Sequence, residues 1–71
     1  MKAIRLFKTT VKSNRQVIKL TPQLNSLLKS RKWNFDLTDC DRILRIEDEN
    51  IPLQKLIFMM NEYNHQIVEL Y

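Results

Sequence analysis

Residues 33–47 read WNFDLTDCDRILRIE, and this stretch carries the clearest structural signal of the chain. Apolar and polar side chains alternate over residues 33–38, and they alternate again over residues 42–47. Alternation with a period of two predicts a strand with one face toward the core. Asp39-Cys40-Asp41 between the two segments has the chemistry of a turn. The stretch therefore predicts a β-hairpin whose inward residues are Trp33, Phe35, Leu37, Leu44 and Ile46.

A stripe of residues at helical spacing precedes this hairpin. Its members are Val17, Leu20, Thr21, Leu24, Leu27 and Leu28. Pro22 falls inside the stripe, and an interior proline usually kinks a helix at a cost of about 3 kcal/mol. Because the stripe keeps its phase across Pro22, we favour one helix over residues 14–30, capped by Ser13 or Asn14 and bent near Pro22. The alternative is a second short helix that starts at Pro22.

A second stripe follows the hairpin and predicts a second helix. Its members are Leu53, Leu56, Ile57, Met60 and then Tyr63 or Asn64. Pro52 fits the first turn of this helix, and Asp48-Glu49-Asn50 is expected to end the preceding strand and to supply caps. Phe58 and Met59 fall off the main stripe. Met60 is interpreted as core filler rather than as a soft-metal ligand.

Strands at the two ends of the chain, over residues 3–11 and 66–71, complete the pattern. The order of elements is then β-α-β-β-α-β, which is typical of the ferredoxin-like α+β fold with a four-stranded antiparallel sheet. Right-handed crossovers place both helices on one face of that sheet. A length of 71 residues leaves room for one domain, residues 1–71.

The other face of the sheet is expected to be uncovered and partly apolar. In this fold the first strand is central, flanked by the third and the fourth. The open face would then carry Ile4 and Leu6 beside Ile43 and one residue of the last strand, Ile67 or Tyr71. A small apolar patch of this kind is a candidate contact surface, and scattered surface hydrophobic residues are the alternative interpretation.

Charge is unevenly distributed along the chain. Residues 1–32 carry nine basic groups and no acid, whereas residues 33–71 have a net charge of −5. If the two halves do not interleave in space, the molecule has one basic face that can steer an acidic partner. If they interleave, the charges pair and the surface has no such preference.

Several functional classes have no support in the sequence. No apolar run is long enough to span a membrane, and the charged N-terminus does not resemble a signal peptide. A single cysteine cannot form an internal disulfide, so a cytoplasmic location is expected. The chain has one histidine and no glycine, which leaves no catalytic dyad with an orienting partner and no phosphate loop. The missing glycine also removes the signatures of common RNA-binding modules, so we expect neither enzymatic activity nor nucleic-acid binding.

The pattern as a whole resembles the heavy-metal-associated domain family, which includes copper chaperones and the N-terminal modules of metal-transporting ATPases. The segment Phe7-x-Thr9-x-Val11 is similar to the family's first strand, and residues 10–16 fall where that family has its Cys-x-x-Cys metal loop. The stripe of the first helix, the hairpin and the second helix also correspond. The resemblance implies the ferredoxin-like fold and a position for a metal site.

This chain departs from the family at the two cysteine positions, which fall on Ser13 and Gln16. Copper(I) and zinc(II) prefer soft thiolates, whereas a hydroxyl and an amide are hard, weak ligands. Arg15 and the neighbouring Lys12 add positive charge where a cation would bind. We therefore expect neither a bound metal nor another cofactor at this loop.

A remnant metal site is the alternative. The topology places three connections at one end of the sheet: the Ser13 loop, the hairpin tip with Cys40, and the loop with His65. Cys40 and His65, with Asp39 or Asp41, could then approach one another. Zinc usually requires three or four good protein ligands, and this set supplies only two and a carboxylate.

The sequence thus predicts a non-catalytic binding module that resembles a metallochaperone domain without its thiolate pair. Its partner would be an acidic protein surface, or a second copy of the chain, bound through Lys12, Arg15 and Lys19 or through the open sheet face. The alternatives are metal trafficking through the divergent site and nucleic-acid binding through the basic half.

Overall fold

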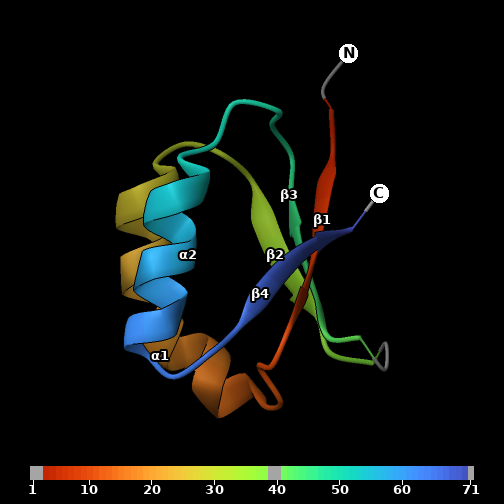
Figure 1. Cartoon of the computed structure of the whole chain (residues 1–71), viewed down its shortest axis with the longest axis vertical. Coiled ribbons are helices and arrows are strands. Elements are labelled where there is room, and N and C mark those ends of the chain that lie inside the picture. The colour runs from red at the N-terminus through yellow and green to blue at the C-terminus, as the bar shows by residue number, and fades with distance from the viewer. Residues whose placement is uncertain (1–2, 39–40, 71) are drawn as a thin grey trace.

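The computed structural model describes residues 3–38 and 41–70 and contains six elements in one chain. The helices lie together on one side of a single twisted sheet (Figure 1). The elements in chain order are β1 (Arg5–Thr9), α1 (Asn14–Leu28), β2 (Trp33–Asp36), β3 (Ile43–Ile46), α2 (Leu53–Glu62) and β4 (Ile67–Leu70). This is the β-α-β-β-α-β order expected from the sequence, and each strand is shorter than its alternating stretch.

The four strands form one antiparallel sheet in the order β2-β3-β1-β4. The central position of β1 between β3 and β4 confirms the ferredoxin-like arrangement. In the register, Phe7 lies opposite Leu44 on one side and Glu69 on the other. Because side chains alternate along a strand, this register places every second residue of each strand on the helix side.

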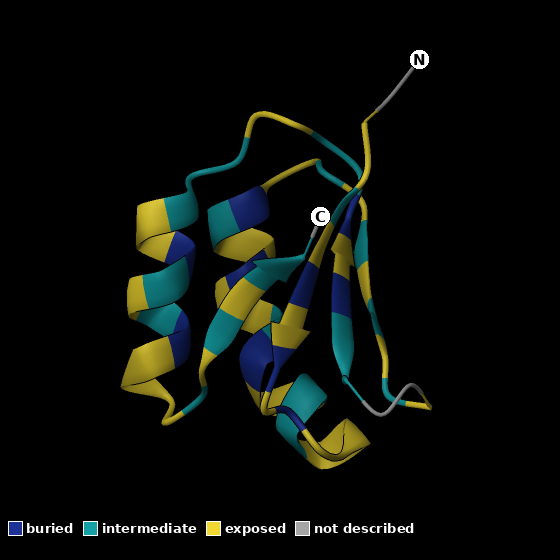
Figure 2. Cartoon of the chain, turned by 45° about the vertical axis from the view of Figure 1, so that its right-hand side comes forward, coloured by how far each residue is buried: buried dark blue, intermediate teal, exposed yellow. Residues whose placement is uncertain are grey.

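The core lies between the sheet and the two helices (Figure 2). Its fully buried members come from both layers and are Phe7, Val11, Leu20, Leu24, Leu28, Leu44, Ile46, Leu56 and Met60. Trp33, Phe35 and Leu37 are half-buried and pack against this cluster, as the alternation of the hairpin predicts. Burying such side chains is the main source of stability in a domain of this size.

Helix α1 runs through Pro22 as one element, so the interpretation of two separate helices is wrong. Its direction changes between the first turns and the remainder in both overall views (Figures 1 and 2). Pro22 has no N–H for the carbonyl of Ile18, a residue that is 70% exposed and therefore open to water. The neighbouring Thr21 donates its hydroxyl to the carbonyl of Val17 at 2.7 Å, a bond that often accompanies a bend.

The start of α2 differs from expectation. Its N-cap is Pro52, with no side-chain capping bond, so Asp48-Glu49-Asn50 does not cap the helix. Asp48 instead accepts a hydrogen bond from the backbone N–H of Asn50 at 2.9 Å, which closes the loop itself. Further along, Met59 packs half-buried against the core although it lies off the main stripe, whereas Phe58 is exposed.

Among the described residues, three adopt positive φ: Lys29 at 56°, Arg42 at 51° and Asn64 at 64°. Each follows or precedes a regular element, where the chain must reverse direction. Glycine normally occupies such positions, and this chain contains none.

Candidate functional site

The loop before α1 contains the two positions where the resemblance places metal ligands. Ser13 has extended backbone angles and is the N-cap of α1, and its Oγ accepts a hydrogen bond from the backbone N–H of Gln16 at 3.3 Å. The Oε1 of Gln16 in turn accepts a hydrogen bond from the backbone N–H of Lys12 at 2.6 Å. These reciprocal bonds form a variant of the capping box and satisfy backbone donors at the helix start. Of the two predicted caps, Ser13 and Asn14, Ser13 is the N-cap, and Asn14 is the first residue of the helix.

The capping bonds explain what the loop does with its side-chain oxygens. Both the hydroxyl of Ser13 and the amide oxygen of Gln16 are acceptors for backbone N–H groups. Neither atom is a soft ligand, and the exposed cations of Lys12 and Arg15 lie beside them. The donor set of this loop therefore does not fit copper(I) or zinc(II).

Lys12, Arg15 and Lys19 form what we call the Lys12 patch. All three are exposed, and none of them makes an ion pair within residues 3–38 and 41–70. Arg15 and Lys19 are four residues apart, so they lie on one face of α1. Helix α1 contains no acidic residue at all, and this leaves the patch electrostatically uncompensated on its own element.

A hollow of about 310 Å³ adjoins the Lys12 patch between the start of α1 and the end of α2. Gln16, Lys19, Glu62 and His65 are among the residues that line it. The hollow is therefore polar and contains charges of both signs. It brings two candidate positions, Gln16 and His65, to one surface, as the predicted clustering of loops requires.

Thr10 ties the loop of His65 to the end of β1, a role that sequence analysis did not identify. Its hydroxyl lies 3.2 Å from Nδ1 of His65 and accepts a hydrogen bond from the backbone N–H of Gln66 at 3.0 Å. The backbone N–H of Thr10 donates to the carbonyl of Gln66 at 3.3 Å. In the sequence, these contacts of Thr10 are signalled only by two adjacent threonines, Thr9 and Thr10, at the end of the strand.

The hairpin closes on the same end of the sheet. The neighbouring Thr9 donates its hydroxyl to the carbonyl of Arg42 at 2.7 Å, and its backbone N–H contacts the carbonyls of Asp41 and Arg42. The Ser13 loop, the hairpin and the His65 loop therefore meet at one end, at the bottom of Figure 1. We call this the Ser13 end (residues 10–16, 41–42 and 63–66).

The remnant metal site falls partly outside the described residues, because these do not include Asp39 and Cys40. Of the remaining members, Asp41 forms an ion pair with Lys8 at 3.7 Å, and His65 contacts Thr10. Residues 3–38 and 41–70 contain no group of three His, Cys, Asp or Glu side chains arranged to hold a metal ion.

The open face of the sheet is partly apolar, with one correction to its expected composition. Ile4 is 47% exposed and Leu6 is 37% exposed, and Ile43 lines a shallow hollow of about 400 Å³ beside Leu6. Ile67 packs against the core instead, and Val68 takes its place on the open face at 61% exposure. Tyr71 lies outside the described residues.

The aromatic residues near the basic half all pack in or against the core, and Phe35 also lines the shallow hollow beside Leu6. Phe7 is fully buried, and Trp33 and Phe35 pack against the core. The described strand residues of the open face, in contrast, include no aromatic side chain. Proteins commonly bind single-stranded RNA by stacking its bases on aromatic side chains of an open sheet. No described strand residue whose side chain alternates onto this face supplies an aromatic ring.

The opposite end of the molecule carries two hollows that sequence analysis did not predict. The first, of about 540 Å³, is lined by residues that include Arg31, Lys32, Trp33 and Arg45. The second, of about 530 Å³, is lined by residues that include Lys29, Arg31 and Lys55. Arg31 belongs to both, so the two hollows adjoin. We call this the Arg31 end (residues 29–32 and 47–52).

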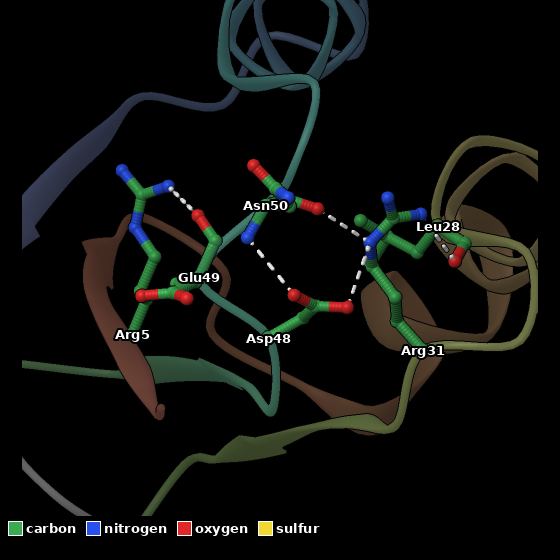
Figure 3. A network of polar contacts seen from close by, with 6 residues as sticks. All are labelled: Arg5, Leu28, Arg31, Asp48, Glu49 and Asn50. Carbon is green, nitrogen blue, oxygen red and sulfur yellow. Dashed lines mark hydrogen bonds and ion pairs between the residues drawn. The ribbon is translucent and has the colours of Figure 1, made fainter. Parts of the chain in front are cut away.

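Two arginines hold the loop between β3 and α2 at this end (Figure 3). Arg31 donates from Nε to the carbonyl of Asn50 at 2.7 Å and from Nη1 to the carbonyl of Leu28 at 3.1 Å, and it lies 3.5 Å from the carboxylate of Asp48. Arg5 reaches the same loop from the other side and donates from Nη1 to the carbonyl of Glu49 at 2.9 Å. Arg31 therefore connects the end of α1 to the loop that precedes α2.

Arg5 also forms the shortest ion pair of the described residues. Its Nε and Nη2 donate to the two carboxylate oxygens of Glu69 at 2.7 and 2.6 Å. These bonds lower the pKa of Glu69 and raise that of Arg5, because each charged partner stabilises the other. The pair joins the central strand β1 to the edge strand β4.

Comparison of the chain with protein-family models, with curated proteins and with solved structures gave no match in any of the three. Among residues 3–38 and 41–70, neither helix has the length and apolar character needed to cross a membrane. The assignment of a function consequently depends on the geometry of the two ends of the molecule.

Proposed function

We propose that this chain is a non-catalytic protein-binding module of the heavy-metal-associated type, in which the metal loop has become a helix cap. The Lys12 patch docks on an acidic protein surface. One observation carries this proposal: Ser13 and Gln16 are engaged in capping, whereas Lys12, Arg15 and Lys19 beside them are exposed and make no ion pair within the described residues.

The physical basis of the docking is electrostatic. Exposed charges of one sign raise the rate at which a partner of opposite sign associates, and they lower its rate of dissociation only modestly. Because the rigid cap fixes the start of α1, Arg15 and Lys19 are presented on an ordered helix rather than on a mobile loop. A second copy of the chain offers its own acidic half as a partner of the same chemistry.

A charge-reversal experiment tests the proposal. The chain is immobilised and used to capture proteins from its source cells, in three forms: the unmodified chain, Lys12→Glu/Arg15→Glu/Lys19→Glu, and the control Lys29→Glu/Lys32→Glu/Lys55→Glu. Both variants change the net charge equally, and all six residues are exposed. The unmodified chain and the control should retain a common acidic protein that the first variant loses.

The captured protein is then titrated at increasing salt. Surface charges are screened within about 8 Å at physiological ionic strength, so the affinity should fall as salt rises. Equal retention by both triple variants, or an affinity indifferent to salt, would contradict docking through the Lys12 patch. Sedimentation of the chain alone shows whether the partner is a second copy.

A further inference from the structure

We infer that the two hollows of the Arg31 end form a binding site for single-stranded nucleic acid. This site is distinct from the Lys12 patch, which lies at the other end of the sheet, and its argument does not depend on the protein-docking proposal. The hollows combine the two features that such ligands need: cations placed for phosphates and a fixed aromatic ring for a base.

The charge of the site comes from both halves of the sequence. Lys29, Arg31 and Lys32 follow α1, whereas Arg45 lies in β3 and Lys55 lies in α2. Residues 33–71 are acidic overall, yet the fold brings their Arg45 and Lys55 to the basic turn. Cations from three elements thus surround the hollows, and this convergence is not visible along the chain.

With Arg45 and Lys55 included, the cations around the hollows outnumber the acids of this end, and Glu49 lines neither hollow. Glu47 is the one carboxylate that lines the first hollow, and no acid lines the second. Asp48 is engaged with Arg31. Lys29, Lys32, Arg45 and Lys55 are exposed and make no ion pair within residues 3–38 and 41–70. Several uncompensated cations therefore remain available to phosphate groups.

The aromatic wall is held in place before any ligand arrives. The indole Nε1 of Trp33 donates to Oδ1 of Asn25 at 3.1 Å, and the ring of Phe35 meets it edge-on at 84°, with 6.0 Å between centroids. Trp33 is half-buried against the core and still lines the first hollow. A ring fixed in this way loses little conformational freedom on stacking, which favours binding.

The alternatives fit these observations less well. An acidic peptide would use the cations but has no general use for an immobilised indole. A single small anion would use one or two of the cations and leave the second hollow unused. The amides of Asn25 and Asn34 also line the first hollow, and amides can hydrogen-bond to base edges. The combination favours a chain of nucleotides that spans both hollows.

Trp33 is the only tryptophan of the chain, so its fluorescence reports on this site alone. The test titrates the full chain with a single-stranded DNA of about 12 nucleotides at low salt and follows tryptophan emission. Stacking of a base on the indole should quench the emission with a saturable isotherm. Polyglutamate of similar length and inorganic phosphate are the parallel probes, and neither should produce the quench.

The cation contacts are tested by salt and by matched variants. For single strands, the logarithm of affinity falls with the logarithm of salt concentration with a slope of about −0.7 for each phosphate neutralised. Lys32→Ala/Arg45→Ala should weaken binding about tenfold and should reduce that slope by about 1.4. The control Lys12→Ala/Lys19→Ala removes the same charge in the Lys12 patch and should leave the slope and the quench nearly unchanged.

Trp33→Ala, measured with a fluorescein-labelled DNA by anisotropy, should weaken binding by about tenfold or more. Because Trp33 packs against the core, the circular dichroism spectrum of the Trp33→Ala variant is recorded as well. If this variant is unfolded, the conclusion rests on Lys32→Ala/Arg45→Ala and on its control Lys12→Ala/Lys19→Ala. Three results would overturn the inference: no quench, an equal affinity for polyglutamate, or an equal loss in the Lys12/Lys19 control. None of these results bears on retention of a protein by the Lys12 patch.

Discussion

The two ends of the sheet hold their loops by different chemistry. At the Ser13 end the loops are held mainly by neutral groups: Ser13, Gln16 and Thr10 accept hydrogen bonds from backbone N–H groups. The ion pair of Asp41 with Lys8 at this end is longer, at 3.7 Å. At the Arg31 end, Arg31 and Arg5 use charged guanidinium groups on carbonyls and carboxylates. The neutral bonds leave Lys12 and Arg15 available to a partner, whereas the guanidinium of Arg31 uses part of its hydrogen-bonding capacity to hold the fold. Arg31 therefore mainly holds the fold, whereas exposed cations at both ends remain available for recognition.

The largest expected effect comes from exchanging the neutral cap for thiolates. In a Cys40→Ser background, Ser13→Cys/Gln16→Cys places two sulfurs at the positions that correspond to the metal ligands of the heavy-metal-associated family, which the sequence resembles. Because copper(I) prefers two thiolates, this variant should compete for copper(I) with a strong chelator under reducing, anaerobic conditions. A competition titration measures the change, which amounts to binding where the unmodified loop is expected to show none.

Two controls accompany this titration. Cys40→Ser alone should not compete, and one introduced thiol should bind far more weakly than two. The unmodified chain, with Cys40 and His65 intact, is titrated with copper(I) and zinc(II) as well. Tight binding that Cys40→Ser or His65→Ala abolishes would establish the divergent site and would contradict a loop that has only a structural role.

Removing the guanidinium of Arg31 should destabilise the fold more than removing the capping hydroxyl of Ser13. Arg31→Met keeps most of the side-chain stem but leaves the carbonyls of Leu28 and Asn50 without their charged donor. Hydrogen bonds to charged groups contribute about 1.5–3 kcal/mol, so the free energy of unfolding should fall by about 2 kcal/mol. Urea denaturation measures it, and Lys32→Met, at an exposed neighbouring position, should change stability by less than about 0.5 kcal/mol.

Removal of the neutral cap should have a smaller effect. Ser13→Ala deletes the acceptor for the backbone N–H of Gln16, and loss of an N-cap typically costs about 1 kcal/mol. Ser13→Asp keeps an acceptor at the same place and should retain most of the stability. If Ser13→Ala destabilised the chain as much as Arg31→Met, the contrast between the two ends would not hold.

The smallest expected effect is the pH dependence of the Arg5–Glu69 pair. The pKa of Glu69 lies below its ordinary value of 4.5 in the folded chain, because Arg5 stabilises its charged form. The contribution of the pair is therefore fully present above the unfolded pKa and is lost as the pH falls through the folded pKa. Glu69→Gln should flatten the stability profile below about pH 4.5, whereas Glu62→Gln, at an exposed position, should not. Thermal melts across this pH range measure the difference.

The fold was predictable because periodicity reports burial directly. The alternation of residues 33–38 and 42–47 and the stripe of α1 each identify one buried face, and the structure confirms both. The composition of the open face was less certain because side chains alternate with a period of two. A shift of one residue in β4 exchanges Ile67 for Val68, and both are β-branched and apolar, so the pattern alone does not choose between them.

The Ser13 end was also largely accessible from the sequence, since capping depends on residues three or four positions apart. The Arg31 end was not. Arg31, Arg45 and Lys55 are separated by at least ten positions each, and only the crossover of α1 and the register of β3 bring them together. The same limitation applies to Asp48, whose sequence context suggests a helix cap but whose contacts close the loop and reach Arg31.

The backbone at Lys29 places stability and charge in competition. With φ of 56° and ψ of −118°, this residue occupies a region that glycine enters freely and that a side chain with a Cβ enters at a cost. Lys29→Gly should therefore increase the free energy of unfolding by about 1 kcal/mol and raise the thermal midpoint accordingly. The same substitution removes a cation from the second hollow. A single substitution would thus move folding and ligand affinity in opposite directions. Selection for foldability alone would favour glycine here, so a lysine kept among relatives of this chain would be a record of selection for binding.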